Sequence, residues 1–359
     1  METNKKLDVH LSRPGSLIAA IPAVLGFVPE KSLVLVTVAD GEMGAVMRVD
    51  LSVELSEGLG RMASMAARGD ADGAIAVIVD AATFDCVLCA EERRELAADL
   101  TGRLGSQGIE LLAFYVVDRV AADGRWRCGD GSGACGTVDD PECSPLSMAA
   151  VLEGRRLYGR RSELAAVVSG TDPESAEALR KKLEKRWAAV AYRSRPVAEV
   201  RADIEHFLAV ATRPGLGKLR DADVVRIACA VRDVQVRDAL YGLAIGGLAG
   251  AAEELWAQLT RRVPGIWRLE PLVLLAFCAY CRGDGPLAGI SLQAALDIDA
   301  THRMADMLDT ALQCGMRPEQ IRTLALTGYR LARNLGVMLP TVQAVGRPAP
   351  GACPRPSRP

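Results

Sequence analysis

Hydrophobic and polar positions in the first third of the chain follow patterns of both strands and helices. Ser32 to Val38 and Ala45 to Leu51 are short, largely apolar runs with the length of β-strands. Asp40-Gly41, between them, is a dipeptide typical of tight hairpin turns. The pattern therefore predicts a β-hairpin. A short helix from Leu17 to Leu25, which Gly26 can end, is expected to precede it.

Helical and apolar stretches then alternate up to residue 117. The helical stretches are 54–68 and 90–104, and the apolar runs that follow them are 74–79 and 111–117. Such alternation predicts parallel strands joined by crossover helices. A further short strand is expected at 125–128, after the turn signal Asp123-Gly124. We therefore expect an α/β domain with a mixed, mostly parallel sheet that includes the N-terminal hairpin.

The composition changes between Gly129 and Ser144, where Gly, Asp, Pro and Cys dominate, and no convincing strand follows. The remaining apolar positions have helical spacing. They predict helices near 146–158, 173–191, 197–212, 221–243, 252–262, 270–281, 286–297, 302–314 and 318–334. We therefore expect an α/β domain over residues 1–145 and an all-helical domain over residues 146–340. The proline-rich tail, residues 341–359, is expected to be disordered.

Small residues near the C-terminus resemble a helical repeat. Ala276, Ala288, Leu292 and Ala295 have the spacing of a tetratricopeptide helix pair. A single pair is not an array, and helix pairs in a simple bundle have a similar spacing. The helical domain is therefore expected to be tetratricopeptide-like or a bundle. An array would offer a groove to a protein partner.

Composition excludes some classes of function. Lys and Arg total 43 and Asp and Glu total 45, so the chain lacks the basic excess of most nucleic-acid-binding proteins. The stretch 155–201 has twelve basic and six acidic residues, which is typical of a solvated helical face; docking of RNA or of an acidic partner is the alternative. Nucleic acid is therefore not expected as a partner.

The sequence also indicates a compartment. The first ten residues are polar and charged, unlike a secretory signal, and the longest uncharged apolar run, Ala239 to Ala252, is too short to cross a bilayer. We therefore expect a cytoplasmic protein that has no membrane partner and keeps its ten cysteines reduced. Only three histidines are present, which limits histidine-based chemistry.

Three predicted strands end in aspartate, at Asp50, Asp80 and Asp118. Parallel strands would place these carboxylates on one edge, where open α/β sheets bind ligands and where carboxylates can hold Mg²⁺. Aspartates also open turns and cap helices whatever the function, so that interpretation stays open. Arg48 shares a strand face with Asp50. This pair predicts either an anion- or metal-binding site or the solvated face of an edge strand.

Two further groups are candidates for binding. Arg125 and Trp126 are expected near the acidic edge and complete the candidate ligand-binding residues. Cys128, Cys135 and Cys143 share one Gly/Asp-rich loop and are candidate ligands of a structural metal, with reduced free thiols as the alternative. No other cofactor is predicted.

Two Cys-x-x-Cys pairs differ in their setting. Cys86 and Cys89 follow a strand and open a helix, a position that favours the thiolate. They are expected to be either a redox pair or two small buried apolar residues. Cys278 and Cys281 lie inside a predicted helix, where two sulfurs make a poor disulfide.

Several segments resemble an actinobacterial family known as domain of unknown function 4192. The matching segments are Ile21 to Val34, Arg48-Val49-Asp50-Leu51, Gly124-Arg125-Trp126, the loop from Cys128 to Gly136-Thr137, Gly154-Arg155, Arg282-Gly283-Asp284-Gly285, Ala288 and Ala294-Ala295-Leu296. The family tends to carry adjacent cysteines before its Gly-Thr, whereas Cys135 stands alone here. The resemblance implies a fold and a lineage and no activity.

Two functions follow as hypotheses. The first is a non-enzymatic interaction or regulatory protein that docks a protein partner through its helical domain, because no complete catalytic constellation accompanies the large helical region. The second is a metal- or nucleotide-dependent enzyme, or a ligand-binding protein, that uses the carboxyl edge of the sheet.

Overall fold

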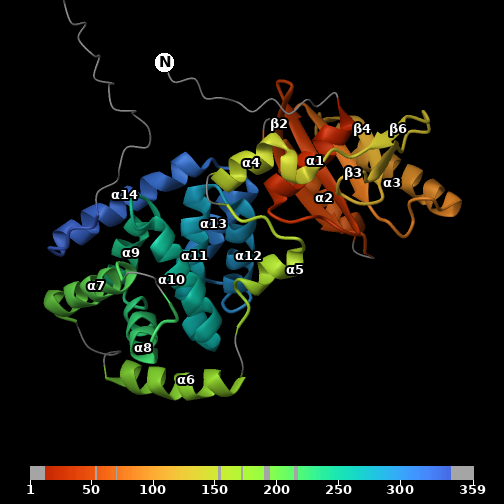
Figure 1. Ribbon diagram of the computed structural model, residues 1–359. Coiled ribbons are helices and arrows are strands. Elements are labelled where there is room, and N and C mark those ends of the chain that lie inside the picture. Colours follow the sequence, from red (N-terminus) through yellow and green to blue (C-terminus); the bar gives the residue numbers. More distant parts are fainter. Residues whose placement is uncertain are drawn as a thin grey trace, which may run out of the picture.

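The computed structural model describes residues 13–52, 55–69, 71–152, 155–170, 173–189, 195–213 and 217–340. A sheet with flanking helices forms the N-terminal part, and a helical assembly forms the C-terminal part (Figure 1). The predicted tail at 341–359 lies outside the described residues.

The first helix, α1 (Pro14–Leu25), starts a turn earlier than the sequence suggests, with Pro14 in its first turn. Pro22 lies inside α1, and the helix continues through it. Gly26 ends the helix in the left-handed conformation, with φ of 74°, and its N–H donates to the Pro22 carbonyl. The predicted helix end at Gly26 is therefore confirmed, because glycine adopts this conformation without steric cost.

The sheet has six strands in the order β2-β1-β3-β4-β5-β6. The strands are β1 (Ser32–Ala39), β2 (Glu42–Asp50), β3 (Gly73–Val79), β4 (Glu110–Val117), β5 (Arg125–Cys128) and β6 (Cys135–Thr137). The predicted hairpin is confirmed: β1 and β2 pair antiparallel around Asp40 and Gly41, which both have positive φ.

The prediction of a mostly parallel sheet is wrong. Among the strands of the described residues, only the β3–β4 pairing is parallel, whereas β1–β2, β1–β3, β4–β5 and β5–β6 are antiparallel. The crossovers do return each strand in the same direction, because β2, β3 and β4 all run the same way. The hairpin, however, inserts β1 between β2 and β3, and β5 and β6 extend the sheet as a meander.

The two faces of the sheet have separate cores. Leu33, Leu35 and Ile78 point to the face covered by α2 (Leu55–Ala67) and α3 (Val87–Gly105). Val34 and Val77 point to the opposite face, where they share a core with α1 and with the C-terminal helices. This alternation follows from the two-residue period of strands.

The helical part contains ten α-helices within the described residues. They are α5 (Arg161–Ala166), α6 (Pro173–Ala188), α7 (Val197–Ala211), α8 (Asp221–Ala230), α9 (Val234–Leu240), α10 (Ala249–Arg262), α11 (Leu269–Arg282), α12 (Gly285–Leu296), α13 (Arg303–Gln313) and α14 (Pro318–Asn334). Helix α4 (Pro145–Leu152) precedes them in the chain and packs on α1 beside the sheet. The single helix expected at 221–243 is two helices, because the Asp233 carboxylate accepts from the Gln235 N–H and caps a new helix.

Helix α11 is the centre of the helical part. Its residues from Pro271 to Cys281 are all buried, and it packs against α10, α12 and α14. Gly283, with φ of 88°, turns the chain, and the Asp284 carboxylate caps α12 by accepting from the Leu287 N–H at 3.1 Å. The small residues Ala276, Ala288 and Ala295 are fully buried, as close packing of α11 and α12 requires.

The two parts share one continuous core. Leu17 and Ile21 of α1 belong to the same buried cluster as Trp256 and Phe277 of the helical part. The backbone also connects them, since Phe27 pairs with Tyr158 in an isolated bridge. Within the described residues, no helix combines the length and the apolar character needed to cross a bilayer.

Candidate functional site

The carboxyl edge of the sheet gathers the three aspartates that end predicted strands. Ser32, the first residue of β1, pairs with Asp50 on one side and with Val79, which precedes Asp80, on the other. Asp118 follows β4 on the same edge, because β3 and β4 are parallel. The common edge therefore exists although β1 separates β2 from β3.

The sheet divides the six predicted binding residues between its two faces. Arg48, Asp50 and Trp126 lie with the α1 face, because Arg48 lies over Phe27 and Trp126 packs on Tyr115. Asp80, Asp118 and Arg125 lie with the opposite face, beside α3. The six residues therefore do not form one site.

Arg48 and Asp50 pair with each other on the edge strand. Arg48 Nη2 lies 2.5 Å from Asp50 Oδ1, and it also donates to the Glu30 carbonyl at 3.2 Å. The Asp50 side chain is 63% exposed. Arg48, in contrast, is only 13% exposed and lies over the Phe27 ring, so only the Asp50 end of the pair faces solvent.

Asp118 is buried and fixes the start of β5. Its Oδ1 accepts from the Arg125 backbone N–H at 2.8 Å, and its Oδ2 accepts from Arg125 Nε at 3.1 Å. The hydrogen bonds that Arg125 donates to Asp118 and then to Asp85 raise the pKa of Arg125. The guanidinium groups of Arg125 and Arg127 both lie over the Phe84 ring, at 4.8 and 4.9 Å from its centre. Asp118 thus holds β5 and the 80–86 loop together.

Asp80 closes the loop that leads into α3. Its Oδ1 accepts from the Ala82 N–H at 3.1 Å and its Oδ2 from the Thr83 hydroxyl at 2.5 Å. This is the turn-opening role that aspartate has after many strands. Unlike Asp50 and Asp118, Asp80 also lines a cavity.

The loop cysteines are dispersed. Cys128 ends β5 and is partly buried, Cys135 starts β6 and is exposed, and Cys143 lies in a short 3-10 helix where its thiol donates to Asp140. No group of three or more His, Cys, Asp and Glu side chains suited to a metal ion occurs among the described residues. The geometry of that part of the chain therefore does not support the predicted metal site.

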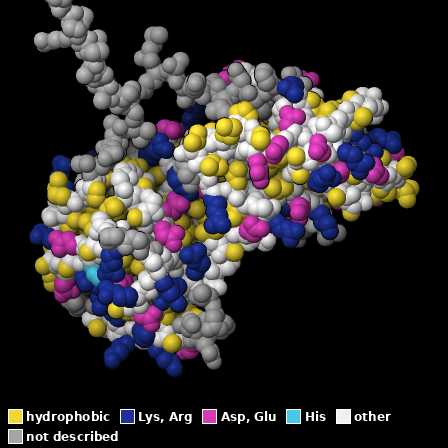
Figure 2. Space-filling model, viewed as in Figure 1, with side chains coloured by type: hydrophobic (Ala, Val, Ile, Leu, Met, Phe, Trp, Pro, Cys, Tyr) yellow, Lys and Arg dark blue, Asp and Glu magenta, His cyan; other side chains and the backbone are white. Residues whose placement is uncertain are grey.

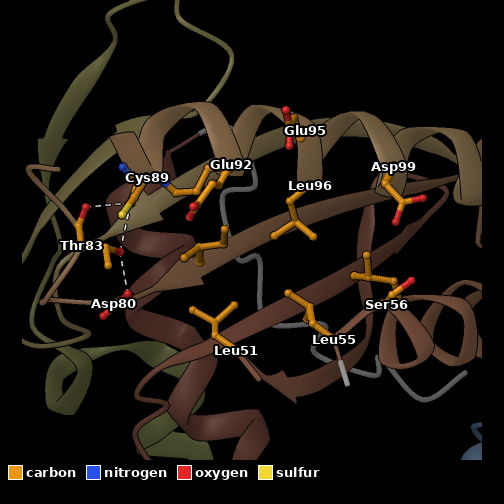
Figure 3. A pocket seen from close by; sticks show the side chains of 13 residues that line it. Leu51, Leu55, Ser56, Asp80, Thr83, Cys89, Glu92, Glu95, Leu96 and Asp99 are labelled. Carbon is orange, nitrogen blue, oxygen red and sulfur yellow. Dashed lines mark hydrogen bonds between the residues drawn. The ribbon is translucent and has the colours of Figure 1, made fainter. Parts of the chain in front are cut away.

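A cavity of about 490 Å³ opens between α2, α3 and the carboxyl edge of the sheet (Figure 3). Its lining is Leu51, Leu55, Ser56, Leu59, Ile78, Asp80, Thr83, Cys89, Glu92, Arg93, Glu95, Leu96 and Asp99. A volume of this size is typical of a small-molecule site.

The cavity combines an apolar floor with an acidic wall. Leu51 and Leu55 lie opposite α3, and Glu92 and Asp99 extend from α3 toward the strands with Leu96 between them (Figure 3). Neither Glu92 nor Glu95 forms an ion pair with another described residue, whereas Asp99 pairs with Arg103 at 2.8 Å. The wall therefore carries uncompensated negative charge.

Arg93 is the only cation among the described residues of the lining, and its hydrogen bonds go to other groups of the protein. Its Nη1 donates to the carbonyl and hydroxyl of Thr83 at 2.8 and 3.1 Å, and its Nη2 donates to the Cys86 carbonyl at 3.3 Å. Burial, and then the charge of Arg127, lower the pKa of Arg93. Arg93 holds the 83–86 loop through neutral acceptors, so its positive charge offsets only one of the four carboxylates of the lining.

Sequence reasoning named Asp80 as a binding candidate and Cys89 as a thiol candidate, but it did not bring them together with the other lining residues. The missed signal is the spacing of Cys89, Glu92, Leu96 and Asp99, which returns to one helix face every three or four residues. That spacing shows a shared face but not what the face covers. Because α3 is mostly exposed, the pattern reads as an ordinary solvated helix.

Comparison with known proteins identifies a family. A family described as "Domain of unknown function (DUF4192)" matches residues 14–319, which is most of the chain. The chain therefore belongs to this family, as the resemblance of its motifs implies. No curated protein and no solved structure matches the chain.

Proposed function

We propose that this member of the DUF4192 family is a ligand-binding protein whose cavity between α2 and α3 takes a small organic cation with an apolar body. The observation that carries the proposal is the lining, in which four carboxylates accompany leucine and isoleucine side chains and the single arginine is engaged by the 83–86 loop. An ammonium group would meet Glu92, and an alkyl or aromatic body would cover Leu51 and Leu55.

The sign of the charge favours a cation over a nucleotide. Phosphate-binding sites offer backbone N–H groups, arginine or lysine to the anion. Here the wall presents Glu92, Glu95 and Asp99, which would repel phosphate, while the side-chain donors of Arg93 point to Thr83 and Cys86. The nucleotide-dependent alternative is therefore the weaker of the two.

The test is a thermal-shift measurement with hexylammonium, hexanol and hexanoate, which share one apolar chain and differ in charge. A ligand that binds only the folded state raises the melting temperature. We expect hexylammonium to raise it most and hexanoate not to raise it. Magnesium-ATP is included in the same series, and a rise with magnesium-ATP but not with hexylammonium would contradict the proposal.

A matched pair of variants locates the effect. Glu92→Gln removes a carboxylate from the cavity wall, and Glu91→Gln removes one from the next residue of α3. The Glu91 carboxylate lies outside the cavity lining and pairs with Arg94 at 2.8 Å. Both variants change the net charge equally, so loss of the hexylammonium shift in Glu92→Gln alone would assign binding to the cavity.

The surface of α4, which packs on α1, supports a second candidate function, docking of a protein partner. Helix α4 exposes Met148, Val151 and Leu152, of which Leu152 is 87% exposed. These positions follow the spacing of one helix face, and Figure 2 shows hydrophobic side chains gathered over this part of the surface. An exposed apolar stripe of this kind is typical of interaction surfaces.

Capture of binding partners by the full chain tests the docking surface. Leu152→Glu should abolish retention of a specific partner, whereas Leu326→Glu, at an exposed position on α14, should leave it unchanged. If both variants retain the partner equally, α4 is not the docking surface. A tetratricopeptide-like groove, which is a further form of this hypothesis, would instead place the contact on α11–α14.

We infer a boundary between an α/β domain and a helical domain at residue 145, where α4 begins. We also infer that the protein works in the cytoplasm; free cysteines throughout the described residues are consistent with a reducing compartment. In Figure 2, acidic side chains lie among the basic ones of the helical part, which does not favour nucleic acid as a partner.

A further inference from the structure

Cys86 and Cys89 form a close pair at the start of α3. Cys86 is the N-cap residue of this 19-residue helix, and its Sγ accepts a hydrogen bond from the Cys89 backbone N–H at 3.5 Å. The Cys89 side chain adds a second hydrogen bond to the same sulfur. Both thiols are free and both are partly exposed. The alternative of two buried apolar residues is thus wrong for this pair.

The second Cys-x-x-Cys pair provides an internal comparison. Cys278 and Cys281 have the same spacing but lie in the middle of α11, where they are 4% and 1% exposed. Burial raises the pKa of Cys281 to about 12 and that of Cys278 well above its usual value. Spacing alone therefore does not distinguish the pairs, whereas access and helix position do.

The surroundings of Cys86 favour its thiolate. The N–H groups of the first turn of α3 point toward its sulfur, and the Arg93 guanidinium donates to its carbonyl at 3.3 Å. Hydrogen bonds from the backbone and then the side chain of Cys89 lower the pKa of Cys86. The hydrogen bond to Cys86, and then burial, raise the pKa of Cys89. The pair is therefore asymmetric: Cys86 is suited to be the attacking thiol and Cys89 the resolving thiol.

An exposed apolar surface accompanies the pair. Val87 and Leu88, the two residues between the cysteines, are 83% and 82% exposed. Apolar side chains with this exposure at a helix start gain nothing for the isolated chain. They are suited to contact a bound apolar segment beside the sulfur of Cys86.

We propose that Cys86 and Cys89 form a reversible dithiol–disulfide couple that exchanges with an external disulfide flanked by apolar groups. The proposal rests on the geometry of the two thiols and not on the cation proposed for the cavity, although Cys89 also lines that cavity. Low-molecular-weight and protein disulfides share the chemistry, and the apolar pair Val87 and Leu88 favours a disulfide in a protein segment.

The exchange has two balanced steps. The Cys86 thiolate attacks one sulfur of the external disulfide, its S–S bond breaks, and the displaced thiolate takes a proton from water. Cys89 then loses its proton to water and attacks Cys86 Sγ, which releases the second external thiolate, and this thiolate also takes a proton from water. The protein loses two electrons and two protons, and the external disulfide becomes two thiols.

The experiment incubates the full chain in glutathione buffers of graded redox potential, blocks the remaining free thiols, and identifies linked peptides by mass spectrometry. We expect a Cys86–Cys89 disulfide that forms and disappears reversibly with the potential, while Cys278 and Cys281 stay reduced. Cys89→Ser should instead accumulate glutathione on Cys86, because the second step is lost. Cys86→Ser should lose both products.

Two outcomes would overturn the proposal. One is the absence of the Cys86–Cys89 disulfide at every potential; the other is equal glutathione addition to Cys86→Ser and Cys89→Ser, which would mean that neither thiol is the preferred nucleophile. A peptide disulfide flanked by leucine is compared with glutathione disulfide in the same assay. If the peptide oxidises the Cys86–Cys89 pair faster than glutathione disulfide does, and Leu88→Ser removes this difference, the natural oxidant is a protein disulfide. Equal rates of oxidation would indicate a low-molecular-weight disulfide.

Discussion

The guanidinium of Arg93 lies beneath the loop that carries both Asp80 and Cys86. It joins the second turn of α3 to the Thr83 carbonyl, the Thr83 hydroxyl and the Cys86 carbonyl. Its planar fork reaches these separate acceptors at once, which a lysine ammonium cannot do with the same geometry. The side chain therefore orders one wall of the cavity and the N-cap of α3 together.

Arg93→Lys should destabilise the fold by about 1–3 kcal/mol, because buried carbonyls lose charge-assisted hydrogen bonds. Urea unfolding followed by circular dichroism measures this change. Arg94→Lys is the control, since Arg94 is 58% exposed and pairs with Glu91 on the surface of α3. A loss of stability that is the same in both variants would show that Arg93 does not hold the loop.

Asp223 has a comparable role in the helical part. Its carboxylate is 3% exposed and accepts from Arg213 at 2.7 Å and from Arg220 at 2.9 Å. Burial alone would raise its pKa, but the hydrogen bonds from the two arginines lower the pKa of Asp223 to about 2. Because its pKa is lower in the folded state, the charged form stabilises the fold above the unfolded value of 3.8, and that stability is lost as the pH falls toward 2.

Asp223→Asn should therefore cost about 2 kcal/mol at neutral pH, the free energy of a shift of this size. The difference from the wild type should narrow as the pH is lowered from about 4 toward 2, since the wild-type carboxylate then takes up its proton. Free energies of unfolding from urea titrations across this range provide the measurement. A difference that stays constant with pH would contradict the role of the charge.

At the scale of elements, short sequence motifs correctly predicted turns and helix ends, which depend on residues adjacent in the chain. Asp40-Gly41 specified the hairpin, and Gly26 specified the end of α1, because positive φ is a property of single residues. The position of β1 between β2 and β3 is a long-range choice that no local pattern encodes. The same limit applies to the cavity. The sequence indicates the face of α3 that carries Glu92, but it does not indicate that this face lies opposite α2.

A backbone contact shows how closely two elements of the helical part approach. Gly328 of α14 packs on the 3-10 helix Tyr241–Ala244, and a Cβ atom at position 328 would lie 2.4 Å from the Gly242 nitrogen. No flexible side chain could move to make room, because the obstructing atoms belong to the backbone. Helix α14 therefore depends on glycine at this position.

Gly328→Ala should destabilise the protein by about 1–3 kcal/mol despite the better helix propensity of alanine. Gly102→Ala in α3 is the matched control: nothing lies within 4 Å of its added Cβ atom. That substitution should raise stability by up to about 1 kcal/mol, as alanine does in exposed helices. The two midpoints of urea unfolding should thus move in opposite directions, and a parallel shift would refute the close contact.

At the scale of the whole molecule, α1 joins the sheet to the helical part. It packs against α4 and α12, and a Cβ atom at Gly26 would lie 3.2 Å from the Pro286 ring at the start of α12. The shared cluster contains Val34 and Val77 from the sheet and Leu272 and Phe277 from α11. The boundary at residue 145 marks a change of secondary structure, but the buried hydrophobic cluster contains residues from both sides of it.

This continuity predicts that the sheet and the helical part unfold as one cooperative unit. Native-state hydrogen exchange at rising urea should bring the amides of β3 and α11 to the same free energy of opening, because neither part can keep its core without the other. Leu17→Ala, which removes a fully buried side chain of α1, should lower both values equally, by about 2–5 kcal/mol. If the β3 amides open at a lower free energy while α11 stays protected, the two parts fold independently, and the surface of α1 that joins them contributes little to stability.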